Sequence, residues 1–261
     1  MNENTIKAMS EQIKKLIVDK LPNNSSLILV GYRGSIAHGM YVPKSNPNSI
    51  DDKDIMGIYA FSQESYLGIE KLKETIEIKE GELDVVLYEL KKLLHLLIKG
   101  NPNVLSLLWL EPTHYIYITP EGQTLIDNRE LFVSKQVYHS FSGYAYGQLH
   151  RMTHAACQGY MGEKRKQLVE KFGYDTKNAA HLIRLLRMAI EFLNEGRLYV
   201  QRPDAQNLLE IKRGEWTLEQ VKKEADRLFI LANEAYTKSY LKNDVDFNKI
   251  NDLCHQIIER K

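Results

Sequence analysis

The segment LILVGYRGSIAHG, residues 27–39, decides how the first half of the chain is interpreted. Its short apolar run at 27–30 predicts a buried strand, and three glycines follow that run. A glycine between a strand and a helix lets the backbone approach a ligand, and the amides at a helix start attract phosphate. Gly34 and Ser35 are therefore candidate phosphate-binding residues, although an ordinary turn has the same composition.

Acidic residues open the next predicted strand, DDKDIMGIYAF, residues 51–61. Side chains two positions apart lie on the same face of a strand, so Asp52 and Asp54 are expected to point the same way. Neighbouring carboxylates repel each other unless a cation neutralises them, and Mg²⁺ prefers oxygen ligands. The alternative is an exposed acidic turn at the start of the strand.

A third carboxylate, Asp84, interrupts the apolar segment LDVVLYEL. A charge in such a strand is costly unless it is paired or bound to a metal, or lies at a strand end that faces water. Residues 71–79 and 83–87 predict two further strands joined by a turn at 80–81. A helix is predicted for 88–99, and Asn-Pro-Asn at 101–103 predicts a turn.

Helical periodicity dominates the second half of the chain. Helices are predicted for residues 137–160, 162–171, 175–195, 217–242 and 246–259. Thr217 with Gln220 fits a capping box, and residues 1–21 also predict an amphipathic helix. The expected fold is α+β, with a mixed sheet and helices in a domain of residues 1–132, followed by an all-helical domain of residues 133–261.

A polar stripe follows one face of the predicted helix 175–195. Lys177, His181 and Arg184 are spaced i, i+4 and i+7, which places them on the same helical face. A solvated face explains such a stripe, and so does a cleft in which cations hold phosphate groups. Tyr174 before the helix could stack on a base or pack in the core, and Asp175 fits a helix N-cap.

The composition excludes several classes of protein. Among 261 residues, 35 Lys and Arg balance 34 Asp and Glu, so the chain lacks the strongly basic coat of an indiscriminate nucleic-acid binder. Two cysteines, Cys157 and Cys254, cannot build a disulfide framework or a Cys-rich zinc site. No run of about 18 apolar residues predicts a membrane span, and a cytoplasmic location is expected.

Three segments together resemble the core of the polymerase-β-like nucleotidyltransferases: GYRGSIAHG (31–39), DDKDIMGIY (51–59) and ELDVVLYEL (82–90). The resemblance implies that Gly34 and Ser35 hold phosphates. It implies that Asp52 and Asp54 bind Mg²⁺ or Mn²⁺, and that Asp84, as the third metal-binding carboxylate, helps to activate the attacking hydroxyl. Asp51 stands where the family usually has Ser, and the spacing favours Asp52 over Asp51 as the first ligand.

Within that family, the chain resembles an uncharacterised bacterial and phage subgroup, through the segments 91–109, 171–196 and 208–216. This resemblance implies a nucleotide-binding role for Tyr174, Lys177, His181 and Arg184. The expected reaction is transfer of a nucleoside monophosphate from an NTP to a hydroxyl of RNA, protein or a small molecule, releasing pyrophosphate by a two-metal mechanism. A nucleotide-binding sensor or antitoxin-like partner without catalysis is the alternative.

Overall fold

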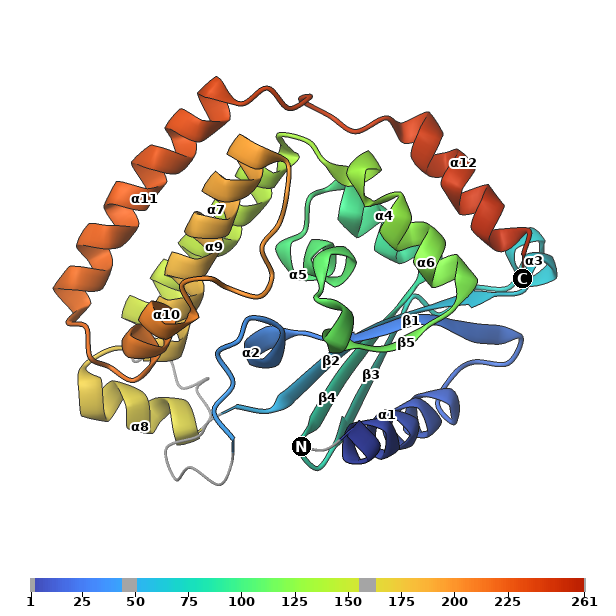
Figure 1. Cartoon of the computed structure of the whole chain (residues 1–261), viewed down its shortest axis with the longest axis horizontal. Coiled ribbons are helices and arrows are strands. Elements are labelled where there is room, and N and C mark those ends of the chain that lie inside the picture. Colours follow the sequence, from blue (N-terminus) through green and yellow to red (C-terminus); the bar gives the residue numbers. More distant parts are fainter. Residues whose placement is uncertain (1–2, 44–50, 155–162, 261) are drawn as a thin grey trace.

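A mixed five-stranded sheet forms the centre of the first half of the chain in the computed structural model, which describes residues 3–43, 51–154 and 163–260 (Figure 1). The strand order is β3-β4-β2-β1-β5, with β2 and β4 parallel and the other neighbours antiparallel. The strands are β1 (Ser25–Tyr32), β2 (Lys53–Phe61), β3 (Thr75–Glu80), β4 (Leu83–Glu89) and β5 (Tyr115–Ile118). The four predicted strands are confirmed, whereas β5 was not predicted.

The two faces of the sheet bury different side chains of β2. Ile55 and Tyr59 join the smaller core beneath helix α1 (Glu3–Val18), while Met56 and Ile58 join the larger core on the opposite face. Because side chains alternate along a strand, Asp54 lies on the same face as Met56 and Ile58. The candidate site is therefore on the face of the sheet that carries the larger core.

The larger core on that face includes α4, α5 and α6, whereas α2 and α3 lie in the connections that follow β1 and β2 (Figure 1). Their bounds are α2 (Gly34–Ala37), α3 (Gln63–Leu67), α4 (Leu90–Ile98), α5 (Pro102–Ser106) and α6 (Pro120–Asp127). The turn predicted at 101–103 is instead the start of α5. The Asn101 side chain accepts from the Asn103 and Val104 amides, and Pro102 occupies the first helical turn, where its missing N–H costs nothing.

The second half is helical, as predicted from its periodicity. Its helices are α7 (Gln136–His154), α8 (Glu163–Phe172), α9 (Thr176–Glu195), α10 (Ala205–Lys212), α11 (Leu218–Lys238) and α12 (Phe247–Ile258). The Thr217–Gln220 capping box and the Asp175 N-cap are both present. Helix α10 was not predicted, and the end of the predicted helix 137–160 lies outside the described residues.

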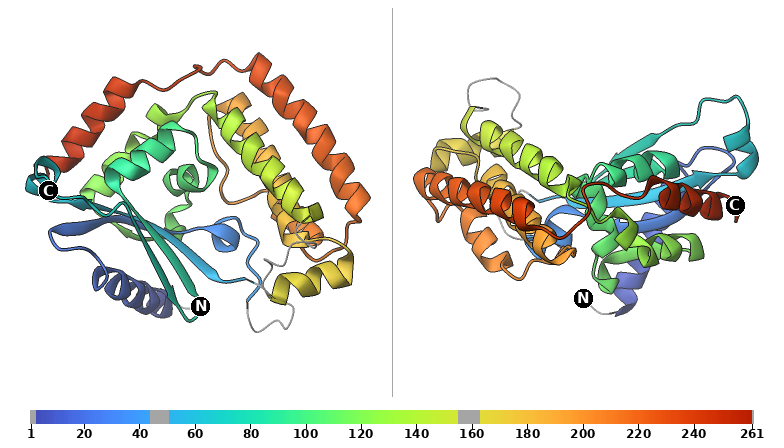
Figure 2. Two further views of the ribbon diagram at one scale, coloured as in Figure 1. Left: turned by 180° about the vertical axis from the view of Figure 1, so that it is seen from behind. Right: turned by 90° about the horizontal axis from the view of Figure 1, so that it is seen from above.

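Both halves share one apolar core. The larger core runs from strand residues such as Ile28 to Phe192 of α9, whose ring meets Trp109 edge-on with centroids 6.1 Å apart. Helix α12 returns across the molecule and packs on α4 and α6 (Figure 2). The division near residue 132 stays a prediction. No helix in the described ranges is long and apolar enough to cross a membrane.

Gly57 tests the tight packing of β2 between its neighbours. A Cβ added there would lie 2.8 Å from Leu87 Cδ2 and 3.0 Å from the Leu29 carbonyl oxygen. Because overpacking forces side chains and backbone to shift, Gly57→Ala should lower the free energy of unfolding by about 1–3 kcal/mol in urea denaturation. Gly143→Ala on α7 is the matched control, because nothing lies within 4 Å of the added Cβ. Equal effects of both substitutions would contradict this packing.

Candidate active site

Three strand ends meet at one edge of the sheet and bring the predicted residues together. Strand β1 runs antiparallel to β2, and β2 runs parallel to β4, so the end of β1 lies beside the starts of β2 and β4. Asp54 and Asp84 are direct register partners on β2 and β4. The Arg33 amide, immediately after β1, donates to the Asp54 carbonyl oxygen at 2.9 Å. The glycine turn is thereby fixed beside the two carboxylates.

Arg33 supplies the cation between this pair of carboxylates. Its Nη2 lies 3.4 Å from Asp84 Oδ1 and 3.9 Å from Asp54 Oδ1. Burial raises the pKa of the Asp54 carboxyl, and this exceeds the opposing effect of Arg33. The ionised form of Asp54 is therefore at a disadvantage here unless additional positive charge is present.

The turn at Gly34 lies directly against the Asp54 carboxylate. Gly34 has a φ of +61°, and a Cβ added to it would lie only 2.3 Å from Asp54 Oδ2. A side chain at this position would thus be strained and would collide with the carboxylate. The next residue, Ser35, has a buried Oγ that makes no hydrogen bond with any described residue.

A cavity of about 290 Å³, which we call the carboxylate cavity, joins this edge of the sheet to α9 and α10. From the sheet side it is lined by Gly34, Ser35, Asp52, Asp54 and Asp84. From α9 it is lined by Lys177, His181 and Arg184, and from α10 by Lys212. Eight of the nine candidate site residues named from the sequence therefore lie around one cavity.

Tyr174 is the candidate that does not line this cavity. Its side chain is buried, and its hydroxyl donates to the Trp216 carbonyl oxygen at 2.6 Å. This contact connects the start of α9 to the segment before α11. Stacking on a base and packing in the core were the two roles considered for Tyr174, and in this structure the side chain packs in the core.

Asp51 differs sharply from its neighbour Asp52. The Asp51 side chain is fully buried, whereas Asp52 is exposed at the cavity. Asp51 Oδ2 accepts from the Val42 amide at 3.0 Å and from Lys212 Nζ, and Lys177 Nζ lies 3.7 Å from Oδ1. Asp51 therefore holds two lysines at the cavity wall and is a positioning residue.

The polar face of α9 is largely covered by protein, with Lys177 and His181 partly buried and Arg184 buried. Arg184 is only 6% exposed, and its Nε has no hydrogen-bond partner among the described residues. Burial, with a smaller effect of Arg202, lowers the pKa of Arg184 to about 9. The guanidinium still carries its charge at neutral pH, and an anion in the cavity would stabilise it.

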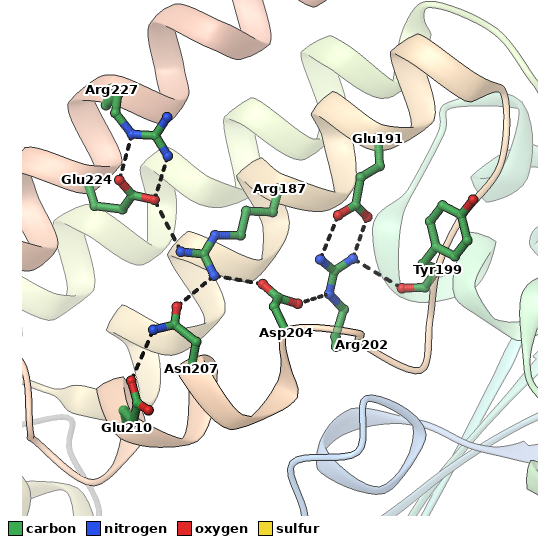
Figure 3. A network of polar contacts seen from close by, with 9 residues as sticks. All are labelled: Arg187, Glu191, Tyr199, Arg202, Asp204, Asn207, Glu210, Glu224 and Arg227. Carbon is green, nitrogen blue, oxygen red and sulfur yellow. Dashed lines mark hydrogen bonds and ion pairs between the residues drawn. The ribbon is translucent and has the colours of Figure 1, made fainter.

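A network of ion pairs holds the elements that form the far wall of the cavity (Figure 3). Arg202, 1% exposed, binds Glu191 of α9 and Asp204 at the start of α10, with Nε 2.8 Å from Asp204 Oδ1. Arg187 of α9 binds the same Asp204 at 2.7 Å and Glu224 of α11 at 3.2 Å. Since α10 ends at Lys212, this network fixes the helix that delivers that lysine.

His38 lies between the glycine turn and this wall. Its Nδ1 is 2.9 Å from the Val200 carbonyl oxygen, so the Nδ1 proton is donated and Nε2 is the acceptor. Burial, and to a lesser extent Arg184, holds the pKa of His38 well below 6.5. The imidazole is thus neutral at neutral pH and can accept a hydrogen bond from a hydroxyl.

The donors at this edge fit a divalent cation that also binds substrate phosphates. Among the described residues, no three His, Cys, Asp or Glu side chains form a complete metal-binding group. Mg²⁺ commonly takes only one or two carboxylates together with water and substrate phosphates. Asp54 and Asp84 supply such a pair, and the Arg33 guanidinium marks the position at which their charge is balanced.

Sequence reasoning missed three contributors to this site. Arg33 and Lys212 were not among the predicted site residues, and Asp51 was considered only as an alternative metal ligand. A cation next to a Gly-Ser turn was the available signal for Arg33. No local signal could have found the contact between Lys212 and Asp51, because 161 positions separate these residues in the chain.

A mixed sheet with a Gly-Ser turn beside paired aspartates is the arrangement expected of a polymerase-β-like nucleotidyltransferase. The chain belongs to the RNA repair pathway DNA polymerase beta family, RlaP, whose family model matches residues 1–256. This match confirms the resemblance seen in the sequence and makes the protein a member of a nucleotidyltransferase family.

A solved structure with similarity to this chain is that of a nucleotidyltransferase-like protein from Exiguobacterium sibiricum 255-15. The identity is 9%, the match covers 98% of this chain and 80% of the other, and the TM-score is 0.30. No curated protein matches the chain.

A double-mutant cycle tests the buried ion pair. Asp51→Asn leaves the Lys212 ammonium without its charged partner, so the free energy of unfolding should fall by about 3–5 kcal/mol. Adding Lys212→Met to Asp51→Asn should cost less than Lys212→Met costs alone, which urea denaturation of the four proteins would measure. Asp226→Asn, at an exposed position on α11, is the control. Strictly additive losses would show that the two residues do not interact.

The buried His38 predicts a loss of stability in mild acid. Below pH 6.5 the unfolded chain binds a proton that the folded His38 excludes, so stability falls by up to about 1.4 kcal/mol per pH unit for this group until its folded pKa is reached. His38→Asn keeps an amide donor for Val200 and should flatten the pH dependence of unfolding between pH 7 and 5. The exposed His95→Gln should leave the slope unchanged. An unaltered slope in His38→Asn would contradict the assignment.

Proposed function

We propose that this protein transfers a nucleoside monophosphate from an NTP to a hydroxyl group at an RNA end, with release of pyrophosphate. Membership of a nucleotidyltransferase family supports the reaction class, and the RNA repair pathway in the family description supports an RNA acceptor. The observation that carries the proposal is the pairing of Asp54 with Asp84 beside the Gly34 turn, in a cavity that also holds two lysines and a buried arginine.

The cationic side chains of the cavity suit the triphosphate. Lys177, Lys212 and Arg184 reach it from α9 and α10, opposite the carboxylates of the sheet. The Ser35 Oγ and the amides of the turn add hydrogen-bond donors. Such fixed charges stabilise the negative charge that develops on the phosphate oxygens during transfer, and they align the α-phosphorus for attack.

Asp54 and Asp84, with Asp52 nearby at the cavity, would hold Mg²⁺ or Mn²⁺, which would neutralise the phosphates and lower the pKa of the attacking hydroxyl. Asp84 orients that hydroxyl and accepts its proton at a carboxylate oxygen. The hydroxyl oxygen forms a bond to the α-phosphorus, and the bond between this phosphorus and the bridging oxygen of the leaving group breaks. Pyrophosphate leaves with the electron pair of that bond.

Substitution of the paired carboxylates tests this function. Asp52→Ala, Asp54→Ala and Asp84→Ala should each lower pyrophosphate release from labelled NTP, Mg²⁺ and RNA by at least about 100-fold, because each removes charge that positions the reactants. Circular dichroism and thermal melting should remain close to wild type, since all three side chains are partly exposed.

Asp226→Asn, which removes an exposed carboxylate of α11, serves as the control and should retain full turnover. Wild-type turnover by Asp54→Ala would exclude the assignment. Saturable NTP binding by the wild-type protein, with no turnover on any acceptor, would instead favour a nucleotide sensor that performs no chemistry.

A further inference from the structure

A second cavity, of about 320 Å³, lies beside the carboxylate cavity and shares part of its wall. The shared wall contains Asp54, His38 and Arg184. The remainder comes from other elements, with Arg33 after β1, Asn103 of α5, and three residues of α7. The α7 residues are Tyr144, Gln148 and Arg151, which are spaced i, i+4 and i+7 and so lie on one face of that helix.

The lining of this second cavity differs from that of the first. The carboxylate cavity has Asp52, Asp54 and Asp84 opposite two lysines, whereas Asp54 is the one carboxylate among the residues that line the second cavity in the described structure. Its cations are arginines, which bind phosphate through two parallel N–H groups. A phosphodiester with a single negative charge matches this lining better than a metal-bound triphosphate does.

Several polar atoms of this cavity have no partner among the described residues. They are Arg33 Nε, Gln148 Oε1 and Arg184 Nε. Arg184 is buried to more than nine-tenths, and its one hydrogen bond in the described structure is a donation from Nη1 to Met188 Sδ at 3.2 Å. Unpaired buried polar groups are costly, so their concentration here indicates a ligand that supplies both an anion and a hydrogen-bond donor.

The tyrosine adds a feature suited to a nucleotide. The Tyr144 hydroxyl oxygen accepts from Asn101 Nδ2 at 2.8 Å, so its own proton is available to a ligand. Its ring is partly exposed and can support a base by stacking. The amide of Gln148 can read a base edge or a ribose hydroxyl. Phosphate, ribose and base are thus each matched by a neighbouring group.

We propose that this second cavity binds the terminal nucleotide of the RNA acceptor, while the carboxylate cavity binds the triphosphate of the NTP. The inference rests on the proposed function, because it assigns the two substrates of that reaction to two cavities. Asp54 and Arg184, in the shared wall, then lie where the acceptor meets the α-phosphate. Arg33 connects the acceptor side to Asp84 through its 3.4 Å contact.

Separate binding measurements on the full chain test the assignment. Fluorescence anisotropy with a short 5′-fluorescein-labelled single-stranded RNA reports acceptor binding, and fluorescence of a methylanthraniloyl-ATP analogue reports NTP binding. The double variant Gln148→Ala/Arg151→Ala, which we call the α7 variant, should weaken RNA binding at least about tenfold and change ATP-analogue binding by less than about twofold. Lys177→Ala should show the reverse pattern.

Arg197→Ala removes an exposed arginine that lines neither cavity, and it should change neither affinity. If the α7 variant weakens the ATP analogue and not the RNA, the second cavity holds the nucleoside of the NTP and the proposal is overturned. The proposal is also overturned if the α7 variant binds RNA as tightly as the wild type does. It is overturned as well if the wild type does not bind RNA, which is the result expected for a protein acceptor. Tyr144→Phe provides a milder second variant if the double variant fails to fold.

The two proposals fail in different ways. Loss of RNA binding in the α7 variant, with no transfer by the wild type on any acceptor, would refute the enzymatic function and leave the RNA site in place. Transfer to RNA by the α7 variant with a normal KM for the acceptor would support the enzymatic function and refute the RNA site. An increased KM for RNA with an unchanged KM for NTP is the result expected when both proposals hold.

Discussion

The proximity of two like charges is the constraint on which the rest of this structure depends. Asp54 and Asp84 begin adjacent parallel strands in the same register, and the Asp54 carboxyl is partly buried. Such a pair is unfavourable alone and becomes favourable only when cations surround it. Arg33 meets part of this requirement from the sheet, and the helical half brings Lys177, Lys212 and Arg184 to the opposite wall. The helical half thus supplies positive charges that the carboxylates of the sheet require.

The lysines in turn require an anchor of their own, which Asp51 provides. A buried carboxylate with two ammonium groups and a backbone amide fixes the start of β2 to α9 and α10 at a single point. Replacing a whole buried ion pair with apolar residues can be neutral for stability, whereas removing one partner alone is costly, so the value of the complete cluster lies in the geometry that it enforces. Asp51 and Asp52 are neighbours in the chain. Asp51 holds the lysines of the cavity wall, whereas Asp52 faces the cavity.

The sequence predicted the parts of this site that depend on local periodicity. Alternation along a strand placed Asp52 and Asp54 on one face, and helical spacing placed Lys177, His181 and Arg184 on another. Neither rule could show that Arg184 is buried, because burial of a polar stripe depends on which elements cover it. The register between Asp54 and Asp84 was likewise beyond reach, since it depends on the pairing of β2 with β4.

Short elements were the part of the fold that the sequence did not reveal. Helix α10 has eight residues, and no cap or long periodic run distinguishes it, although it carries Lys212. Strand β5 has four residues at the edge of the sheet, where hydrogen bonds to β1 define it more than its side chains do. Both elements form through long-range contacts, which composition and spacing do not record.

The return of α12 to α4 and α6 has a mechanical consequence. The polypeptide crosses between the sheet and the helical half before α7 and crosses back after α11, so two covalent connections link these regions. The second connection therefore opposes a wide hinge opening between the sheet and the helical half. Substrates would enter and leave by small displacements of side chains and loops, and the charged walls would keep their spacing from one turnover to the next.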